Sequence, residues 1–421
     1  MVDMAIVGHL SATHIGAITI GTSIFNLIYW NFGFLRMGTS GFTAQAYGAH
    51  RLDEAVRVFV RAFTLALAIA IALLLLQWPI SQLVKVIFNG SPEVIRLALI
   101  YFFVRIWAAP ATLGLYAIKG WYIGMQNSKL PMWIAIFINL VNIACSLLFV
   151  LVLKWDIAGV ALGTVIAQYS GLAMGLFFAR KYYGKIRFKH LEIRNSLRWN
   201  EMRGFFRVNG DIFLRTVCLA CVFTFVTSAS GKISDEVLAI DALLLQFLTL
   251  FSYIMDGFAF AGEALVGRYI GARDLRQLKL SVRLLLLWGL AMTLIFSILY
   301  AIGGESILKI FTNDDTIITG AQHYLYWILI LPLCSFAAFL FDGIFVGATA
   351  SRTMRNSMFV ASSTFFLVYY CGKAILQQGS TPLDEHCWNN LLWTSFMIYL
   401  SLRGILLACK TPCSIYRQAQ N

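Results

Sequence analysis

The 421-residue chain has little charge: only 13% of its residues are Asp, Glu, Lys or Arg, whereas 59% are hydrophobic. One soluble domain cannot bury that much apolar surface, so the composition excludes an ordinary soluble protein and indicates lipid as the solvent for much of the chain. Acidic residues are scarcer than basic ones, 20 against 33. The basic residues fall in short clusters between apolar runs, which is typical of membrane orientation and not of nucleic-acid binding.

Several chemical signatures are also missing from the sequence. No glycine-rich phosphate loop followed by lysine is present, which argues against ATP-driven pumping. The eight cysteines lack the rhythm of a disulfide module, and the Cys218-x-x-Cys221 pair lies in an apolar run, where we interpret it as small core residues. His9 and His14 have no metal-ligand partners at suitable spacing. We therefore expect no metal, no cofactor and no catalytic residues.

Long apolar segments dominate the sequence. A bilayer-spanning helix needs about 20 mostly apolar residues. Eleven segments meet this requirement: residues 14–39, 56–88, 94–122, 131–153, 157–178, 205–228, 237–260, 278–302, 324–346, 358–376 and 388–408. Residues 1–10 are apolar but too short to cross, and they lack the features of a cleaved signal peptide. The expected fold class is an all-α polytopic membrane protein.

An internal repeat predicts how these spans are organised. Gly48-Ala49 recurs as Gly271-Ala272, and the pattern G-x-x-x-G-x-x-x-S-[KR] at residues 120–129 recurs at 343–352. Both matches have an offset of 223 residues, which predicts a duplicated architecture. Under this offset the counterpart of the span 205–228 falls mostly before the first residue. We therefore expect twelve spans, with the first truncated and about twenty residues absent from the start.

Charge predicts the orientation of the two halves. Residues 180–207 carry nine Lys and Arg, and residues 268–283 carry five, so these loops should face the cytoplasm, as should the C-terminus. Both halves then begin on the cytoplasmic side, which predicts two six-helix lobes related by a pseudo-twofold along the membrane normal. The expected lobes are residues 1–198, including a cytoplasmic linker and the incomplete first helix, and residues 199–421.

Long motifs of the sequence resemble a known family. They are MVDMAIVGHL at 1–10, FLRMGTSGFTAQAYGA at 34–49, NGDIFLR at 209–215, MDGFAFAGE at 255–263, and FDGIFVGA at 341–348 followed by MRNSM at 354–358. These runs resemble the DinF branch of the multidrug and toxic compound extrusion (MATE) transporters over nearly the whole chain. The resemblance implies a monomeric antiporter of the bacterial inner membrane. By alternating access it would export small, amphipathic, often cationic organic compounds in exchange for protons or sodium ions.

Asp3 is the first candidate for ion coupling. It matches the first-helix aspartate of the family, which the resemblance implies is the acceptor of the coupling proton or sodium ion. Burial disfavours a charged carboxylate, whereas an arriving cation favours it, so cation and substrate can compete for such a site. The alternative interpretation is an interfacial aspartate that caps a helix end.

A polar pocket is expected next to Asp3 in the N-terminal lobe. Asn139 and Asn142 are three residues apart and share one helix face, and Gln168 lies in the middle of the next span. These residues resemble polar positions of the family's N-lobe pocket, and Tyr116 is a weaker candidate. Asn and Gln also join membrane helices by hydrogen bonds, which is the structural alternative.

The second half carries further ionisable residues within apolar runs, where charge is costly and often functional. The candidates are Asp211, Arg215, Asp241, Asp256 and Asp342, together with Glu263. Asp211 and Arg215 are four residues apart, which predicts an intrahelical ion pair with a structural or gating role. We expect Asp241 to be either a second titratable site or a residue near the external surface. Asp256, Glu263 and Asp342 are expected to fix helix packing and loop geometry.

Two prolines lie in the middle of predicted spans. Pro110 and Pro332 each remove a backbone hydrogen bond and invite a kink. We regard both as candidate hinges for lobe rocking, with a static kink as the alternative.

The favoured function is a cation-coupled exporter, and two alternative functions of other classes stay open. A flippase of a lipid-linked or polysaccharide precursor would need an extended basic groove, and the intramembrane residues Arg36, Arg105 and Arg215 are few and scattered. A membrane-embedded enzyme or assembly subunit would need a paired catalytic signature, which the sequence lacks.

Overall fold

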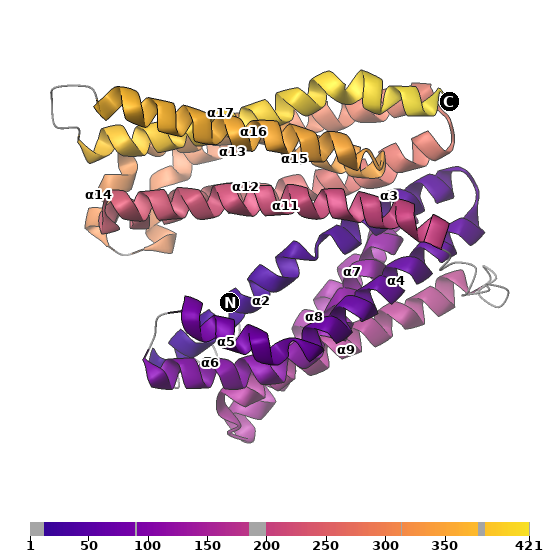
Figure 1. Ribbon diagram of the computed structural model, residues 1–421, viewed down its shortest axis with the longest axis horizontal. Coiled ribbons are helices and arrows are strands. Elements are labelled where there is room, and N and C mark those ends of the chain that lie inside the picture. The colour runs from indigo at the N-terminus through magenta and orange to yellow at the C-terminus, as the bar shows by residue number, and fades with distance from the viewer. Residues whose placement is uncertain (1–11, 89–90, 185–198, 313, 378–383, 421) are drawn as a thin grey trace. The chain divides into compact units, whose positions relative to one another are not determined.

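The computed structural model describes residues 12–88, 91–184, 199–312, 314–377 and 384–420 (Figure 1). Within these ranges all regular elements are helical, and eleven helical segments are long and apolar enough to cross a membrane. The expected all-α polytopic fold is therefore confirmed. The chain divides into two compact units, Met1–Phe206 and Arg207–Asn421, whereas the predicted lobe boundary lay between residues 198 and 199.

The first unit is built around α7, the helix that contains Pro110 in its first turn. Its elements are α2 (Ala12–Asn31), α3 (Phe34–Gly48), α4 (Leu52–Leu75), α5 (Gln77–Ile87), α6 (Pro92–Arg105), η1 (Ile106–Ala108), α7 (Ala109–Gly124), α8 (Lys129–Leu147), η2 (Leu148–Val152) and α9 (Asp156–Tyr183). Trp121 and Tyr122 of α7 are fully buried. The Trp121 indole donates to the Ala55 carbonyl at 2.9 Å and the Tyr122 hydroxyl to the Gly175 carbonyl at 2.6 Å. These bonds fix α7 against α4 and α9.

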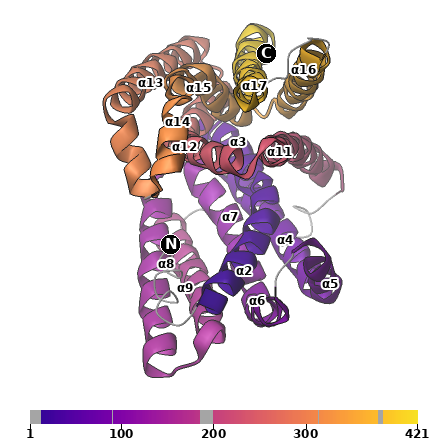
Figure 2. The same cartoon turned by 90° about the vertical axis from the view of Figure 1, so that its left-hand side faces the viewer.

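The second unit is a bundle of long helices, which Figure 2 shows almost end-on. Its elements are α12 (Asp235–Gly271), α13 (Leu275–Phe311), α14 (Asp315–Gln322), α15 (Leu325–Gly347), α16 (Ser351–Gln377), α17 (Glu385–Ser414) and η4 (Tyr416–Ala419), and α11 (Trp199–Ile233) enters it at Arg207. In the core the Tyr300 hydroxyl donates to the Phe247 carbonyl at 2.8 Å. Outward-facing apolar side chains such as Ile302, 84% exposed, require lipid because water would disfavour them.

Prolines explain where the helices differ from the predicted spans. The predicted span 56–88 is two helices, with a break at Leu76, because Pro79 has no N–H to donate to the carbonyl four residues earlier. A 3₁₀ turn, Ile106–Ala108, likewise interrupts the next span just before Pro110. By contrast, α15 continues unbroken through Pro332, so the structure gives that residue no break to act as a hinge.

Backbone conformations confirm the repeat. His50 and Arg273, which are 223 residues apart, both have a left-handed φ of 56° at the turn after a long helix. Gln126 and Thr349 have the same separation and left-handed φ values of 61° and 51°. A non-glycine residue adopts this conformation seldom, so two matched pairs at one offset indicate the same chain path in both halves.

Close helix contacts repeat at the same offset. A methyl group on Gly120 would collide with the backbone of Arg36, and one on Gly343 would collide with the backbone of Ala259. Both glycines allow two backbones to approach closely, as small residues do between membrane helices. The duplicated sequence pattern therefore encodes a duplicated helix crossing, α3 with α7 and α12 with α15.

Candidate functional site

Asp241 lies at the centre of a buried polar cluster in the second unit. Its side chain, on α12, is 1% exposed. The carboxylate accepts a hydrogen bond from the Ser230 hydroxyl of α11, and from Asn389 Nδ2 at 3.0 Å and Trp393 Nε1 at 2.8 Å on α17. Asn389 and Trp393 are four residues apart and so share a helix face. Three helices thus converge on one carboxyl group.

The position of Ser230 follows from the short connection between α11 and α12. Ser234 caps α12, accepting a hydrogen bond from the Val237 amide at 3.3 Å. The chain therefore reverses directly after α11, and this reversal brings Ser230 back beside Asp241, eleven positions later in the sequence.

The hydrogen-bond partners of Asp241 are all neutral. Among the described residues no Lys, Arg or His forms an ion pair with it. Its surroundings are the apolar core that contains Ile240, Leu244 and Phe396. Burial disfavours the charged carboxylate and the three donors favour it, so any proton or cation that arrives here changes the balance between two opposing effects.

One atom of this cluster has no partner. Asn389 is fully buried, and its Oδ1 accepts no hydrogen bond from the described residues. A buried unpaired carbonyl oxygen is costly and needs a physical explanation. Nδ2 of the same amide faces Asp241, so rotation of the side chain is needed to turn Oδ1 toward the carboxyl group.

An acidic cavity of about 550 Å³ adjoins the Asp241 cluster. Its wall consists of Glu236, Val237, Ile240, Thr316, Thr319, Gly320, His323, Tyr324, Asp384, Glu385 and His386. The His323 and His386 rings meet edge to face at 5.4 Å, and Tyr324 packs on His386 at 4.8 Å. Ile240 precedes Asp241 in the chain, and Tyr324 lies beside Asn389. The three carboxyl groups of Glu236, Asp384 and Glu385 therefore line a cavity whose wall includes Ile240, the residue before Asp241.

A second polar cluster joins α11, α15 and α17. Asp342 of α15 accepts from both Arg215 and Arg403, whose side chains are 6% and 3% exposed. Asp256 is near enough to attract Arg403, and Glu263 is buried nearby on the same helix as Asp256. Asp342 thus joins α15 to α11 and α17, and its packing role stays a prediction.

The predicted intrahelical pair of Asp211 and Arg215 is wrong. Asp211 instead accepts from Arg355 Nη1 at 2.6 Å and from the Ser351 hydroxyl at 2.8 Å, both on α16, and Arg215 donates to Asp342. Spacing within one helix permits a pair, but stronger partners on neighbouring helices determine the pairing here. The two residues therefore bind α11 to two different helices.

The structure separates the candidates of the N-terminal lobe. Asn142 Nδ2 donates to Thr164 Oγ1 on α9 at 3.1 Å, and Gln168 follows one turn later on the same face. Asn139 is exposed and donates to the Ala135 carbonyl of its own helix at 3.0 Å. Tyr116, on α7, is half-buried. Asn139 is thus not joined to Asn142 in one hydrogen-bonded pocket.

Asp3 lies outside the described residues, so its predicted role stays a prediction. Sequence reasoning also missed several partners: Ser230, Asn389 and Trp393 around Asp241, and Arg403 beside Asp342. A signal existed for Arg403, which is a charged residue inside the predicted span 388–408. No signal existed for Ser230, a small polar residue of a type common in membrane helices.

Comparisons with known proteins agree over most of the chain. A family model described as MatE matches residues 1–148 and 212–371. The chain is 34% identical over 411 residues to the DNA damage-inducible protein F of Escherichia coli (strain K12), covering 97% of this chain and 86% of that protein. It is 25% identical over 320 residues to multidrug and toxin extrusion protein 1 of Homo sapiens, covering 74% of this chain and 54% of that protein.

Solved structures share the fold. A crystal structure of MATE in the bent conformation superposes with a TM-score of 0.85 at 16% identity, covering all of this chain and 92% of that one. An outward-facing multidrug resistance MATE family transporter gives a TM-score of 0.81 at 17% identity with the same coverage.

Proposed function

The chain belongs to the MatE family of membrane transporters, and from this premise we propose that it is an antiporter that exports organic cations in exchange for protons or sodium ions. The family moves small organic compounds and is not a family of enzymes, and this chain is an integral, multi-pass membrane protein. To these properties the proposal adds three points: the positive charge of the substrate, the identity of the coupling ion, and the residues that bind this ion. It also includes a monomer in the bacterial inner membrane. The charge pattern predicts that the C-terminus of this protein is cytoplasmic.

The observation that carries the proposal is the buried carboxyl of Asp241 held by neutral donors. A carboxylate at membrane depth without a cationic partner is expensive, and such residues mark ion or proton pathways. A bound proton or sodium ion supplies the missing positive charge. Asp241 is therefore the described residue that we assign to coupling, alongside the predicted Asp3.

The geometry of Asn389 supports exchange at this carboxyl. While Asp241 is charged, Asn389 Nδ2 donates to it. When Asp241 is protonated, rotation of the Asn389 amide presents Oδ1 as an acceptor for the new proton. Alternatively, Oδ1, the Asp241 carboxylate and the Ser230 hydroxyl provide oxygen ligands of the kind that hard cations prefer.

Cation release then changes helix packing. Ser230 and Asn389 come from α11 and α17, so a change of charge at Asp241 changes the bonds between these helices and α12. Alternating access needs such a coupling between ion occupancy and the arrangement of helices. An exporter of this kind binds the ion in one state and the organic cation in the other.

The flippase alternative requires an extended basic groove, for which Arg36, Arg105 and Arg215 were the candidates. Arg105 contacts the Tyr101 hydroxyl, and Arg215 donates to Asp342. Two of the three arginines considered for a basic groove are therefore engaged in local contacts.

The test uses purified protein in proteoliposomes and a fluorescent organic cation. An imposed proton or sodium gradient should drive transport by the parent protein, and Asp241→Asn should reduce the gradient-driven rate about tenfold or more. Asp235→Asn is the matched control, because this exposed residue lies on the same helix, six positions earlier. If Asp241→Asn transports as fast as Asp235→Asn with either ion, Asp241 has no role in coupling.

A further inference from the structure

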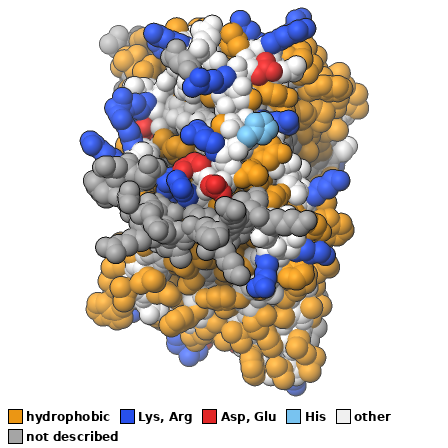
Figure 3. Space-filling model, turned by 90° about the vertical axis from the view of Figure 1, so that its right-hand side faces the viewer, with side chains coloured by type: hydrophobic (Ala, Val, Ile, Leu, Met, Phe, Trp, Pro, Cys, Tyr) orange, Lys and Arg blue, Asp and Glu red, His pale blue; other side chains and the backbone are white. Residues whose placement is uncertain are grey.

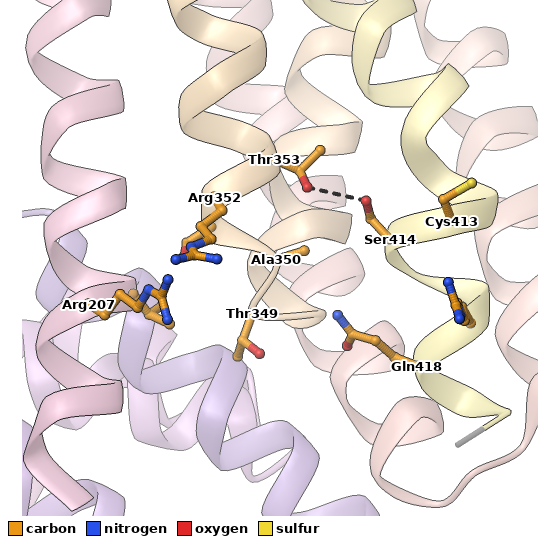
Figure 4. Close-up of a pocket in the computed structure, with 11 residues that line it drawn as sticks. Arg207, Thr349, Ala350, Arg352, Thr353, Cys413, Ser414 and Gln418 are labelled. Carbon is orange, nitrogen blue, oxygen red and sulfur yellow. Dashed lines mark hydrogen bonds between the residues drawn. The ribbon is translucent and has the colours of Figure 1, made fainter. Parts of the chain in front are cut away.

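A pocket rich in arginine lies at one end of the second unit, away from the Asp241 cluster. About 420 Å³ in volume, it is formed by α11, the turn between α15 and α16, the first turn of α16, and the end of α17 with η4 (Figure 4). Its lining is Arg207, Val208, Thr349, Ala350, Ser351, Arg352, Thr353, Cys413, Ser414, Arg417 and Gln418. Four chain segments thus meet around one opening.

The pocket is strongly positive. Arg207, Arg352 and Arg417 line it and are exposed, and no Asp or Glu is among the described residues of the lining. The acid nearest in sequence, Asp211, is buried and already accepts from Arg355 and Ser351. Among the lining residues that the structure describes, none therefore neutralises the three guanidinium groups.

Neutral donors complete the lining. Thr353 Oγ1 and Ser414 Oγ lie 3.2 Å apart across the junction of α16 and α17, and Gln418 points into the same space in Figure 4. The amino end of α16, which begins at Ser351, adds the partial positive charge of a helix start. Guanidinium forks and hydroxyl donors together match the oxygens of a phosphate group.

The position of the pocket favours a phosphate attached to a lipid. It lies where the spans α16 and α17 reach their ends, the depth at which lipid phosphates lie. Phe359, 43% exposed, is seven residues after Arg352 and so lies on the same face of α16, two turns further into the span. A phosphate bound by Arg352 would place its acyl chains along this apolar surface.

Surface charge agrees with this position. Figure 3 looks at the right-hand side of Figure 1 and shows many Lys and Arg side chains over the upper part of this face, with few Asp and Glu among them. Apolar side chains lie on the flanks of the same view. We propose that the arginine pocket binds the phosphate of an anionic phospholipid headgroup.

The test measures lipid binding to the purified full chain in neutral detergent. Dioleoylphosphatidylglycerol is titrated against the thermal unfolding midpoint, with dioleoylphosphatidylcholine and inorganic phosphate as parallel arms at matched ionic strength. We expect the anionic lipid to raise the midpoint of the parent protein and the zwitterionic lipid to do so far less. Loss of two arginines in Arg352→Gln/Arg417→Gln should weaken the apparent affinity for the anionic lipid about tenfold or more.

Charge-matched controls separate a site from general surface attraction. Arg276→Gln/Lys410→Gln removes two exposed cations that do not line the pocket, and its affinity should stay within about twofold of the parent. Arg352→Lys/Arg417→Lys keeps the charge but not the forked guanidinium donors, so its affinity should fall between those of the parent and Arg352→Gln/Arg417→Gln. An unchanged unfolding midpoint without lipid shows that a variant is folded. Equal weakening in the two Gln double variants, or no weakening in either, would overturn the site. If inorganic phosphate raises the unfolding midpoint and the anionic lipid raises it no more than the zwitterionic lipid, the bound phosphate is not that of a lipid.

Discussion

Asn389 donates a hydrogen bond from Nδ2 to Oδ1 of Asp241 across 3.0 Å, while its own buried Oδ1 accepts none from the described residues. The Asn389 amide thus joins α17 to α12, and by rotating it can change from a donor to Asp241 into an acceptor. It predicts that Asn389 adjusts the affinity of Asp241 for its cation.

Asn389→Ala should change the concentration of coupling ion that gives half-maximal transport by about tenfold or more, because a hydrogen bond to a charged group is worth about 1.5–3 kcal/mol. Asn390→Ala is the control: its side chain accepts from Trp327 Nε1 at 3.1 Å and is not a partner of Asp241. Ion-dependent transport in proteoliposomes checks this prediction. An equal shift in both variants would show that the effect is merely structural.

Gly343→Ala should destabilise the second unit by about 1–3 kcal/mol, because the added methyl group meets the backbone of Ala259 in a tight helix crossing. Gly257→Ala has nothing within 4 Å of the added group and should be neutral or slightly stabilising. Thermal unfolding in detergent compares the two. A Gly343→Ala variant as stable as Gly257→Ala would show that the helices are not packed as described.

Asp342→Asn should cost about 3–5 kcal/mol of stability, because the buried Arg215 and Arg403 side chains would then face a neutral amide. Glu305→Gln breaks an exposed pair with Lys309, whose atoms are 2.9 Å apart, and should cost at most about 1 kcal/mol. The yield of folded protein and its unfolding midpoint distinguish these cases. Similar losses in both variants would contradict the assignment of Asp342 as a buried junction of three helices.

Much of the fold could be predicted because the spans and the repeat leave strong local patterns. The offset of 223 residues, read from glycine motifs, reappears in the left-handed turns at His50 and Arg273. Where prediction failed, a tertiary contact or a proline determined the result. Pro79 divided one predicted span, and Arg355 took the place of Arg215 as the partner of Asp211.

The candidate site was predictable only in part. Asp241 could be selected because a charged residue in an apolar run is rare and costly. Its partners could not, since Asn389 and Trp393 are 148 and 152 residues away and nothing in their own helix marks them as donors to a carboxylate. The roles of Asp3 and of the N-lobe residues Asn142 and Gln168 stay predictions.

Proton release tests the coupling role of Asp241 most directly. Purified protein in weakly buffered solution, with a pH indicator, is mixed with a fluorescent organic cation or with sodium ions. The parent protein and Asp235→Asn should release protons on adding one of these ligands, and Asp241→Asn should release about one proton fewer per molecule. Equal proton release from all three proteins with either ligand would contradict the assignment of Asp241 as the residue that exchanges a coupling proton.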